Sequence, residues 1–176
     1  MKKIFILIIL PILFQSFTFI SADADIIQLA HKMQVKYKVP NKKYVTIIDY
    51  RKSILSTRLY LVDMEKNQIV IRSTVAHAFK SGLLFASKFS NDFNSDISSI
   101  GAFETKGTYF GDYGYSLKIN GLDKGINSNA LARKIIFHST KNMHGIYSFG
   151  CFATPVAINQ QLIDKIKGGT LVYVYR

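Results

Sequence analysis

Short apolar runs separated by turn-forming residues recur along most of this chain after residue 40. Runs of this kind, rich in β-branched and aromatic side chains, are typical of β-strands. An irregular polar stretch, residues 79–99, interrupts them and has the length typical of functional or mobile loops. We therefore expect a mainly β fold. The predicted strands span residues 44–50, 58–63, 68–76, 101–110, 115–119, 134–137 and 170–175.

Two helices are expected at the edges of this β structure. Apolar residues recur near helical spacing over residues 25–38, which indicates an amphipathic helix packed on the domain. A second helix is predicted over residues 154–167, with a proline in its first turn and Gly168-Gly169 at its end. The polar Glu65-Lys66-Asn67 joins two predicted strands closely enough to make them a hairpin.

The first residues have the pattern of a secretory signal peptide. Met1-Lys2-Lys3 is basic, residues 4–20 are almost entirely apolar, and Ala22-Asp23-Ala24 places small residues at the cleavage positions. A retained membrane anchor is the alternative. We expect residues 1–24 to be the signal peptide and residues 25–176 to form one domain, exported to the periplasm or cell wall.

The chain is strongly basic, with 23 Lys and Arg against 11 Asp and Glu and a formal net charge of +12. Such a balance favours anionic partners. For an exported protein these are envelope polymers or membrane surfaces, and nucleic acid is not expected. A general contribution to solubility explains the charge equally well.

The candidate chemistry centres on Cys151, the one cysteine in the sequence. Exported domains use cysteines in pairs for disulfides, so a lone cysteine points to catalysis or to an intermolecular disulfide. His138, at the end of an apolar run, supplies an imidazole that can deprotonate the thiol and lower its pKa as an ion pair. Gly150 lets a substrate carbonyl approach the backbone N–H groups. The alternative is an inert buried cysteine beside a core histidine.

Further candidates for the site are the polar residues His77, Arg133 and His144. His77, at the end of the predicted strand 68–76, is a second candidate base. Arg133 binds a substrate carboxylate or forms a structural ion pair. A metal held by His138, His144 and Cys151 matches no standard zinc spacing, so no metal is expected.

Short motifs stand in a fixed order along the chain from about residue 44 to residue 175. They are Ile48-Asp49-Tyr50, Arg58-Leu59-Tyr60-Leu61-Val62-Asp63, Val75-Ala76-His77, Phe89-Ser90-Asn91, Ser98-Ser99-Ile100-Gly101, Gly121-Leu122-Asp123, Asn127, Ala130, Arg133, His138 and Ser148-Phe149-Gly150-Cys151. In this order they resemble the L,D-transpeptidase catalytic domain family, in the branch whose cysteine motif reads Ser-x-Gly-Cys.

The resemblance implies a β-sandwich or barrel with short peripheral helices and no metal or organic cofactor. It implies peptidoglycan stem peptides as substrates. Cys151 would attack the carbonyl between the third residue and D-alanine, and a neighbouring stem's amine would resolve the thioester as a 3→3 cross-link. An L,D-carboxypeptidase using water, or a non-catalytic wall-binding module, remains the alternative. Carbapenem-type β-lactams are the implied inhibitors.

The resemblance also assigns roles to residues. Cys151 is the nucleophile, His138 the base, the main chain of Ser139 orients the imidazole, and the N–H groups of Gly150 and Cys151 form the oxyanion hole. The better-known branch has a histidine where this chain has Phe149, so that substrate contact does not carry over. The residues expected around the substrate are Ser148, Phe149, His77 and Arg133.

Overall fold

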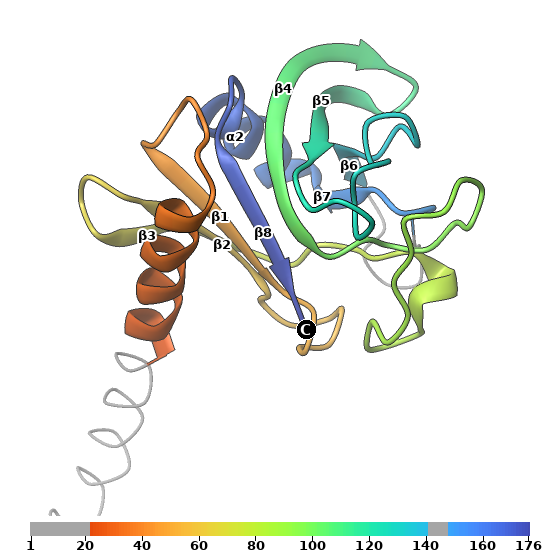
Figure 1. Ribbon diagram of the computed structural model, residues 1–176, viewed down its shortest axis with the longest axis horizontal. Helices are drawn as coiled ribbons and strands as arrows, with labels where there is room; N and C mark the ends of the chain where they lie inside the picture. The colour runs from red at the N-terminus through yellow and green to blue at the C-terminus, as the bar shows by residue number, and fades with distance from the viewer. Residues whose placement is uncertain (1–21, 141–147) are drawn as a thin grey trace, which may run out of the picture.

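The computed structural model describes residues 22–140 and 148–176, which form one eight-stranded sheet (Figure 1). This confirms the mainly β prediction. The strands in chain order are β1 (Tyr44–Asp49), β2 (Leu59–Asp63), β3 (Gln68–Ser73), β4 (Gly101–Gly111), β5 (Gly114–Gly121), β6 (Ile136–Thr140), β7 (Phe152–Pro155) and β8 (Leu171–Tyr175).

The sheet has the order β3-β2-β1-β8-β4-β5-β6-β7 and curls into a nearly closed barrel in which β4 and β5 arch over the rest (Figure 1). Most neighbouring strands run antiparallel, as the short hairpin connections require. The exceptions are β1 with β8 and β6 with β7, which run parallel. The β6–β7 pair joins chain segments that flank the cysteine motif, and it positions the site described below.

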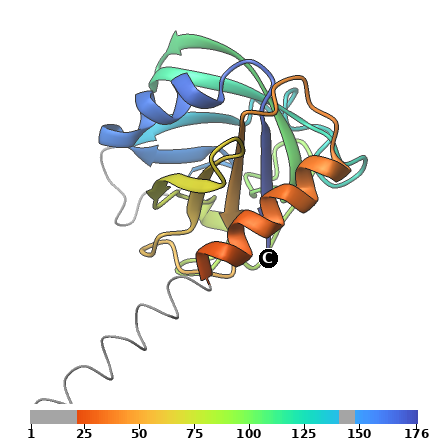
Figure 2. The same cartoon turned by 90° about the vertical axis from the view of Figure 1, so that its left-hand side faces the viewer.

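Both faces of the central strand β1 are buried, which explains its nearly continuous apolar sequence. Ile48 packs into the main core together with Phe103, Phe137 and Phe152. On the opposite face Val45 belongs to a second apolar cluster beneath the N-terminal helix, residues 22–36. Figure 2 shows this helix lying across the sheet, as its amphipathic sequence predicts.

Helix α2 (Val156–Ile166) packs against β6 and β7 and buries Leu162 and Ile163 in the main core. Pro155 precedes its first turn, and Gly168 and Gly169 follow it with φ of +84° and +91°. Glycine adopts this left-handed conformation readily, so the pair ends the helix where the sequence predicts.

Three strand predictions needed correction. Strand β3 ends at Ser73, because residues 75–78 leave their neighbour β2 and hydrogen-bond to the cysteine loop instead. Strand β6 begins at Ile136 and runs on past His138, so the histidine lies inside the strand. Strand β7 was not predicted, since it has only four residues and its pairing partner is distant in the sequence.

The predicted signal peptide, residues 1–24, lies largely outside the described residues. Residues 22–24 belong to the N-terminal helix, where Asp23 forms an ion pair with Arg72 of β3. Within the described residues, no helix combines the length and apolar character needed to cross a bilayer.

Candidate active site

Strands β6 and β7 bring His138 and Cys151 to one pocket. Phe137 is the register partner of Phe152, so His138 follows that pair on one strand and Cys151 precedes it on the other. Side chains alternate between the two faces of a strand. Because the two phenylalanines face the core, His138 and Cys151 both face away from it, into a pocket of about 350 Å³.

The imidazole of His138 is held in one orientation. Its Nδ1 lies 2.9 Å from the carbonyl oxygen of Ser139, and since a carbonyl only accepts, Nδ1 carries the proton. The ring also stacks on Tyr113, with centroids 4.4 Å apart. Burial lowers the pKa of His138, although the Ser139 hydrogen bond opposes this. Neutral His138 therefore has an unprotonated Nε2, ready to accept a proton.

Cys151 is partly exposed, and its Sγ donates weakly to the carbonyl of Lys134 at 3.7 Å. Burial raises the pKa of the thiol, and a backbone hydrogen bond from Ile136 and the charge of Arg133 offset this only in part. The low pKa expected from the sequence is therefore absent in this resting geometry.

The loop before Cys151 is shaped by its own hydrogen bonds. The Ser148 hydroxyl donates to the Cys151 carbonyl at 2.7 Å and accepts from the Gly150 N–H at 3.1 Å. The Gly150 N–H is thus engaged within the loop. The Cys151 N–H makes no hydrogen bond with another described residue, which leaves it as the candidate donor to a substrate oxyanion.

Gly150 is required by packing as well as by backbone conformation. Its φ is +120°, and a Cβ there would lie 2.6 Å from Cδ1 of Ile135. The structure thus adds a packing reason for this glycine to the sequence prediction that it lets substrate approach, which stays a prediction. The missing side chain makes room for the buried wall behind the cysteine.

His77 is fully buried and is absent from the described residues that line the Cys151 pocket. Its Nδ1 lies 2.9 Å from Nη2 of Arg58 and its Nε2 lies 2.8 Å from the carbonyl of Gly82. Burial, together with the Arg58 charge, lowers its pKa to about 4. Both ring nitrogens are engaged inside the protein, so neither is presented to a substrate.

Arg133 reaches the pocket wall, but its Nη1 and Nη2 groups are directed into the loop 90–99. They donate four hydrogen bonds of 2.7 to 3.0 Å to oxygen atoms of that loop. Among the described residues Arg133 makes no ion pair with a carboxylate, so the predicted structural ion pair is replaced by hydrogen bonds. Arg133 thereby fastens the irregular loop to the site.

The other predicted residues line the same pocket. Ser148 and Ser139 both line the pocket, and Phe149 lines it with 72% of its surface exposed. The turn between β4 and β5 contributes Tyr113, whose ring stacks on His138. The full lining is Tyr113, Arg133, Lys134, Ile135, His138, Ser139, Thr140, Ser148, Phe149, Cys151 and Ala153.

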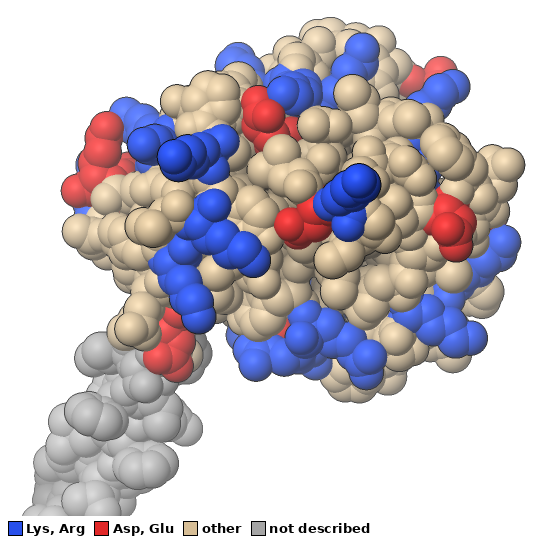
Figure 3. All heavy atoms as spheres, in the orientation of Figure 1, with Lys and Arg blue, Asp and Glu red and all other residues tan. Residues whose placement is uncertain are grey.

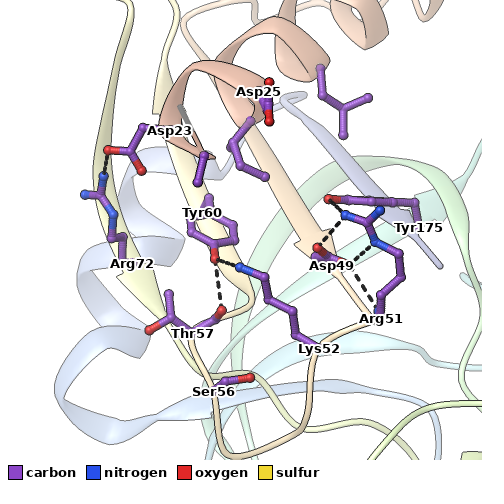
Figure 4. A pocket seen from close by; sticks show the side chains of 13 residues that line it. Asp23, Asp25, Asp49, Arg51, Lys52, Ser56, Thr57, Tyr60, Arg72 and Tyr175 are labelled. Atoms are coloured by element: carbon purple, nitrogen blue, oxygen red, sulfur yellow. Dashed lines mark hydrogen bonds and ion pairs between the residues drawn. The ribbon is translucent and has the colours of Figure 1, made fainter. Parts of the chain in front are cut away.

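A larger cavity of about 760 Å³ lies elsewhere, between the N-terminal helix and the ends of β1, β2 and β8 (Figure 4). Its cations are already engaged. Arg51 pairs with Asp49, and Lys52 donates to the Tyr60 hydroxyl. Arg72 pairs with Asp23 on the far side (Figure 4). The described residues that line this cavity include neither a cysteine nor a histidine.

The described residues contain no group of three or more His, Cys, Asp or Glu side chains arranged to hold a metal ion. Basic side chains are spread over the face in Figure 3, with acidic ones among them. On this face the positive charge is therefore distributed and does not form one patch.

Comparison with solved structures supports the fold. The helical cell shape determining protein Pgp2 (K307A mutant) from Campylobacter jejuni matches with a TM-score of 0.54 and 10% identity, over 76% of this chain and 47% of that one. An L,D-transpeptidase from Mycobacterium smegmatis matches with a TM-score of 0.49 and 8% identity, over 76% and 59%. The L,D-transpeptidase LdtMt1 in complex with imipenem matches with a TM-score of 0.48 and 9% identity, over 76% of this chain and 59% of that one.

The chain thus spans about half to three fifths of the length of these proteins. The comparison with curated proteins found no match. A family model described as the L,D-transpeptidase catalytic domain matches residues 20–175, nearly the whole chain. The chain belongs to the L,D-transpeptidase catalytic domain family.

Proposed function

We propose that this protein is a cysteine-dependent peptidoglycan L,D-transpeptidase, with Cys151 as nucleophile and His138 as base. One observation carries the proposal: the parallel pair β6–β7 delivers both side chains to the same pocket. Family membership supports the activity class. A wall-binding module without catalysis would need neither the thiol nor the oriented imidazole.

The first step uses the Nε2 atom of His138, because Nδ1 donates to the Ser139 carbonyl. Nε2 of His138 takes the thiol proton as the Cys151 sulfur attacks the carbonyl between the third stem residue and D-alanine. The Cys151 N–H donates to the developing oxyanion. The imidazolium then returns the proton to the D-alanine nitrogen, the C–N bond breaks, and an acyl thioester remains on Cys151.

In the second step, an amine of a neighbouring stem attacks the thioester carbonyl. Neutral His138 accepts a proton from that amine, and the Cys151 thiol is regenerated as the 3→3 amide forms. The Ser139 carbonyl would stabilise each imidazolium, since it accepts from the Nδ1 proton. If water replaces the amine, the same site works as an L,D-carboxypeptidase.

The sequence pattern of the first 24 residues supports export, and we place the activity in the periplasm or cell wall, where peptidoglycan is found. Retention of the segment as an anchor would leave the domain in the same compartment. The β-lactam carbonyl of a carbapenem would meet Cys151 as the stem carbonyl does, because both are acyl donors to a thiol.

Incubation with a disaccharide-tetrapeptide, followed by mass analysis, tests the proposal. Cross-linked dimer with release of D-alanine supports transpeptidation. Tripeptide alone identifies the carboxypeptidase, and D-alanine exchange identifies a free amino acid as acceptor. Absence of all three products, from folded protein with a reactive thiol, would overturn the assignment. The Cys151→Ala protein is the matched control.

A further inference from the structure

Residues 75–78 form an extended segment that lies against the loop carrying the thiol. The Ala76 N–H donates to the Ala153 carbonyl at 2.8 Å, and the Ser148 N–H donates to a carbonyl of the segment at 3.1 Å. A parallel bridge joins the same segment to the loop. Ser148 and Ala153 lie on either side of Cys151, so this segment fixes both ends of the turn that presents the thiol.

Arg58, directly before β2, donates hydrogen bonds to the segment 75–78. Its Nε donates to the Val75 carbonyl at 2.9 Å, and its Nη2 donates to the same oxygen and to Nδ1 of His77. Its Nη1 donates to the Lys52 carbonyl at 3.2 Å. The guanidinium also lies 4.8 Å from the ring centroid of Tyr50. A planar fork with several fixed donors is a geometry that lysine cannot reproduce.

This arginine has none of its surface exposed, and among the described residues it forms no ion pair with a carboxylate. A buried charge is costly unless hydrogen bonds satisfy it. Here the partners are the carbonyls of Val75 and Lys52 and the imidazole of His77, and two of these three lie in the segment that contacts the cysteine loop. Any displacement of residues 75–78 leaves buried donors unsatisfied, which makes the segment stiff.

The contact with Arg58 also fixes the tautomer of His77. A guanidinium only donates, so Nδ1 of His77 accepts and Nε2 carries the proton that goes to the Gly82 carbonyl. The ring is therefore a neutral connector from Arg58 to residue 82. Asn places an acceptor near the position of Nδ1, whereas Gln places a donor near the position of Nε2.

We propose that Arg58 and His77 are positioning residues, which hold the segment 75–78 and, through it, keep the Cys151 thiol in the pocket that His138 also lines. The catalytic part of this inference rests on the proposed function. Its geometric part concerns only the thiol and can be measured whether or not the protein forms cross-links.

The test measures two quantities in wild type and in Arg58→Lys, His77→Asn and His77→Gln. The first is the rate of Cys151 alkylation by iodoacetamide against pH, and the second is D-alanine release from a tetrapeptide. In Arg58→Lys and His77→Gln we expect the loop to open. The midpoint of the alkylation rate against pH, which reports the pKa of Cys151, then falls toward the value of free cysteine, about 8.5. Turnover falls about tenfold or more, with little change in KM.

Alkylation and turnover thus move in opposite directions. Because unfolding would also expose the thiol, circular dichroism and urea unfolding are measured for each variant, and only folded variants are compared. His77→Asn keeps an acceptor for Arg58 and should retain the wild-type profile, and Arg72→Lys on the surface is the matched control. If Arg58→Lys does not fold, the two His77 variants decide. Wild-type alkylation and turnover in folded His77→Gln would overturn the inference. Absence of turnover in wild type, with the alkylation shifts present, would instead refute the proposed function alone.

Discussion

Phe137 on β6 stands in parallel register with Phe152 on β7, and their rings stack with centroids 5.0 Å apart. This core pair determines where the chemistry lies. Each strand continues from its phenylalanine to a side chain on the opposite face, His138 on one strand and Cys151 on the other. Packing inside the barrel therefore sets the geometry of the candidate pair outside it.

The first prediction concerns the nucleophile. Cys151→Ala should abolish D-alanine release, because no other thiol exists in the chain, and should leave the fold intact. Cys151→Ser should be nearly as inactive, since a hydroxyl ionises far less readily than a thiol. Product release is measured by mass, and folding by circular dichroism. Substantial turnover by Cys151→Ala would rule the nucleophile out.

The second prediction concerns the base. His138→Gln should lower kcat/KM about a hundred- to ten-thousand-fold, the usual effect of losing one general base. Burial lowers the pKa of His138, so the acidic limb of the wild-type pH–rate profile should lie below its ordinary value of 6.5. That limb should vanish in the variant. His31→Gln, at an exposed histidine, is the control. An unchanged limb in His138→Gln would place the base elsewhere.

The third prediction concerns acid stability. His77 has a pKa of about 4 in the folded protein, against an ordinary value of 6.5. Between these two pH values the unfolded chain binds a proton that the folded chain does not, so stability falls as pH falls. The contribution is complete above 6.5 and amounts to about 3 kcal/mol lost by pH 4. Urea unfolding against pH should be flatter in His77→Gln, and equal slopes would contradict this account.

The fourth prediction concerns Gly150. Gly150→Ala should destabilise the fold by roughly 2 to 4 kcal/mol, because the new methyl group meets Ile135 and the backbone has positive φ. Gly125→Ala is the matched control, since its φ is also positive, +79°, but the space around it is open. Urea unfolding compares the two. An equal loss in both variants would show that the contact with Ile135 is unimportant.

The fifth prediction concerns β-lactams. Incubation with a carbapenem should give one covalent adduct by intact mass, and peptide mapping should locate it at Cys151. The thiol attacks the strained ring amide as it would attack the stem carbonyl. Because the amide nitrogen is part of the opened ring, it stays attached to the acyl group on Cys151. Cys151→Ala should give none. A folded wild-type sample that stays unmodified after prolonged incubation would count against an open acylation site.

The amino-acid sequence by itself determined most of the elements and singled out the two candidate side chains of the site. Local apolar patterns, with proline and glycine at the ends of the helix, predict strands such as β1 and β8 and helix α2. The lone Cys151 and the strand-borne His138 pointed to a thiol and its base, and the family followed from the order of motifs. All of this information is local, or depends only on spacing along the chain.

Only the tertiary structure decided in which direction the pKa values of His77 and Cys151 shift and which groups they contact. His77 looks like His138 in sequence, yet Arg58 and burial make it a neutral internal connector. Burial likewise raises the thiol pKa of Cys151, where spacing alone had suggested a lowered one. Desolvation and hydrogen-bond partners come from segments far apart in the chain, and they form only when the sheet closes.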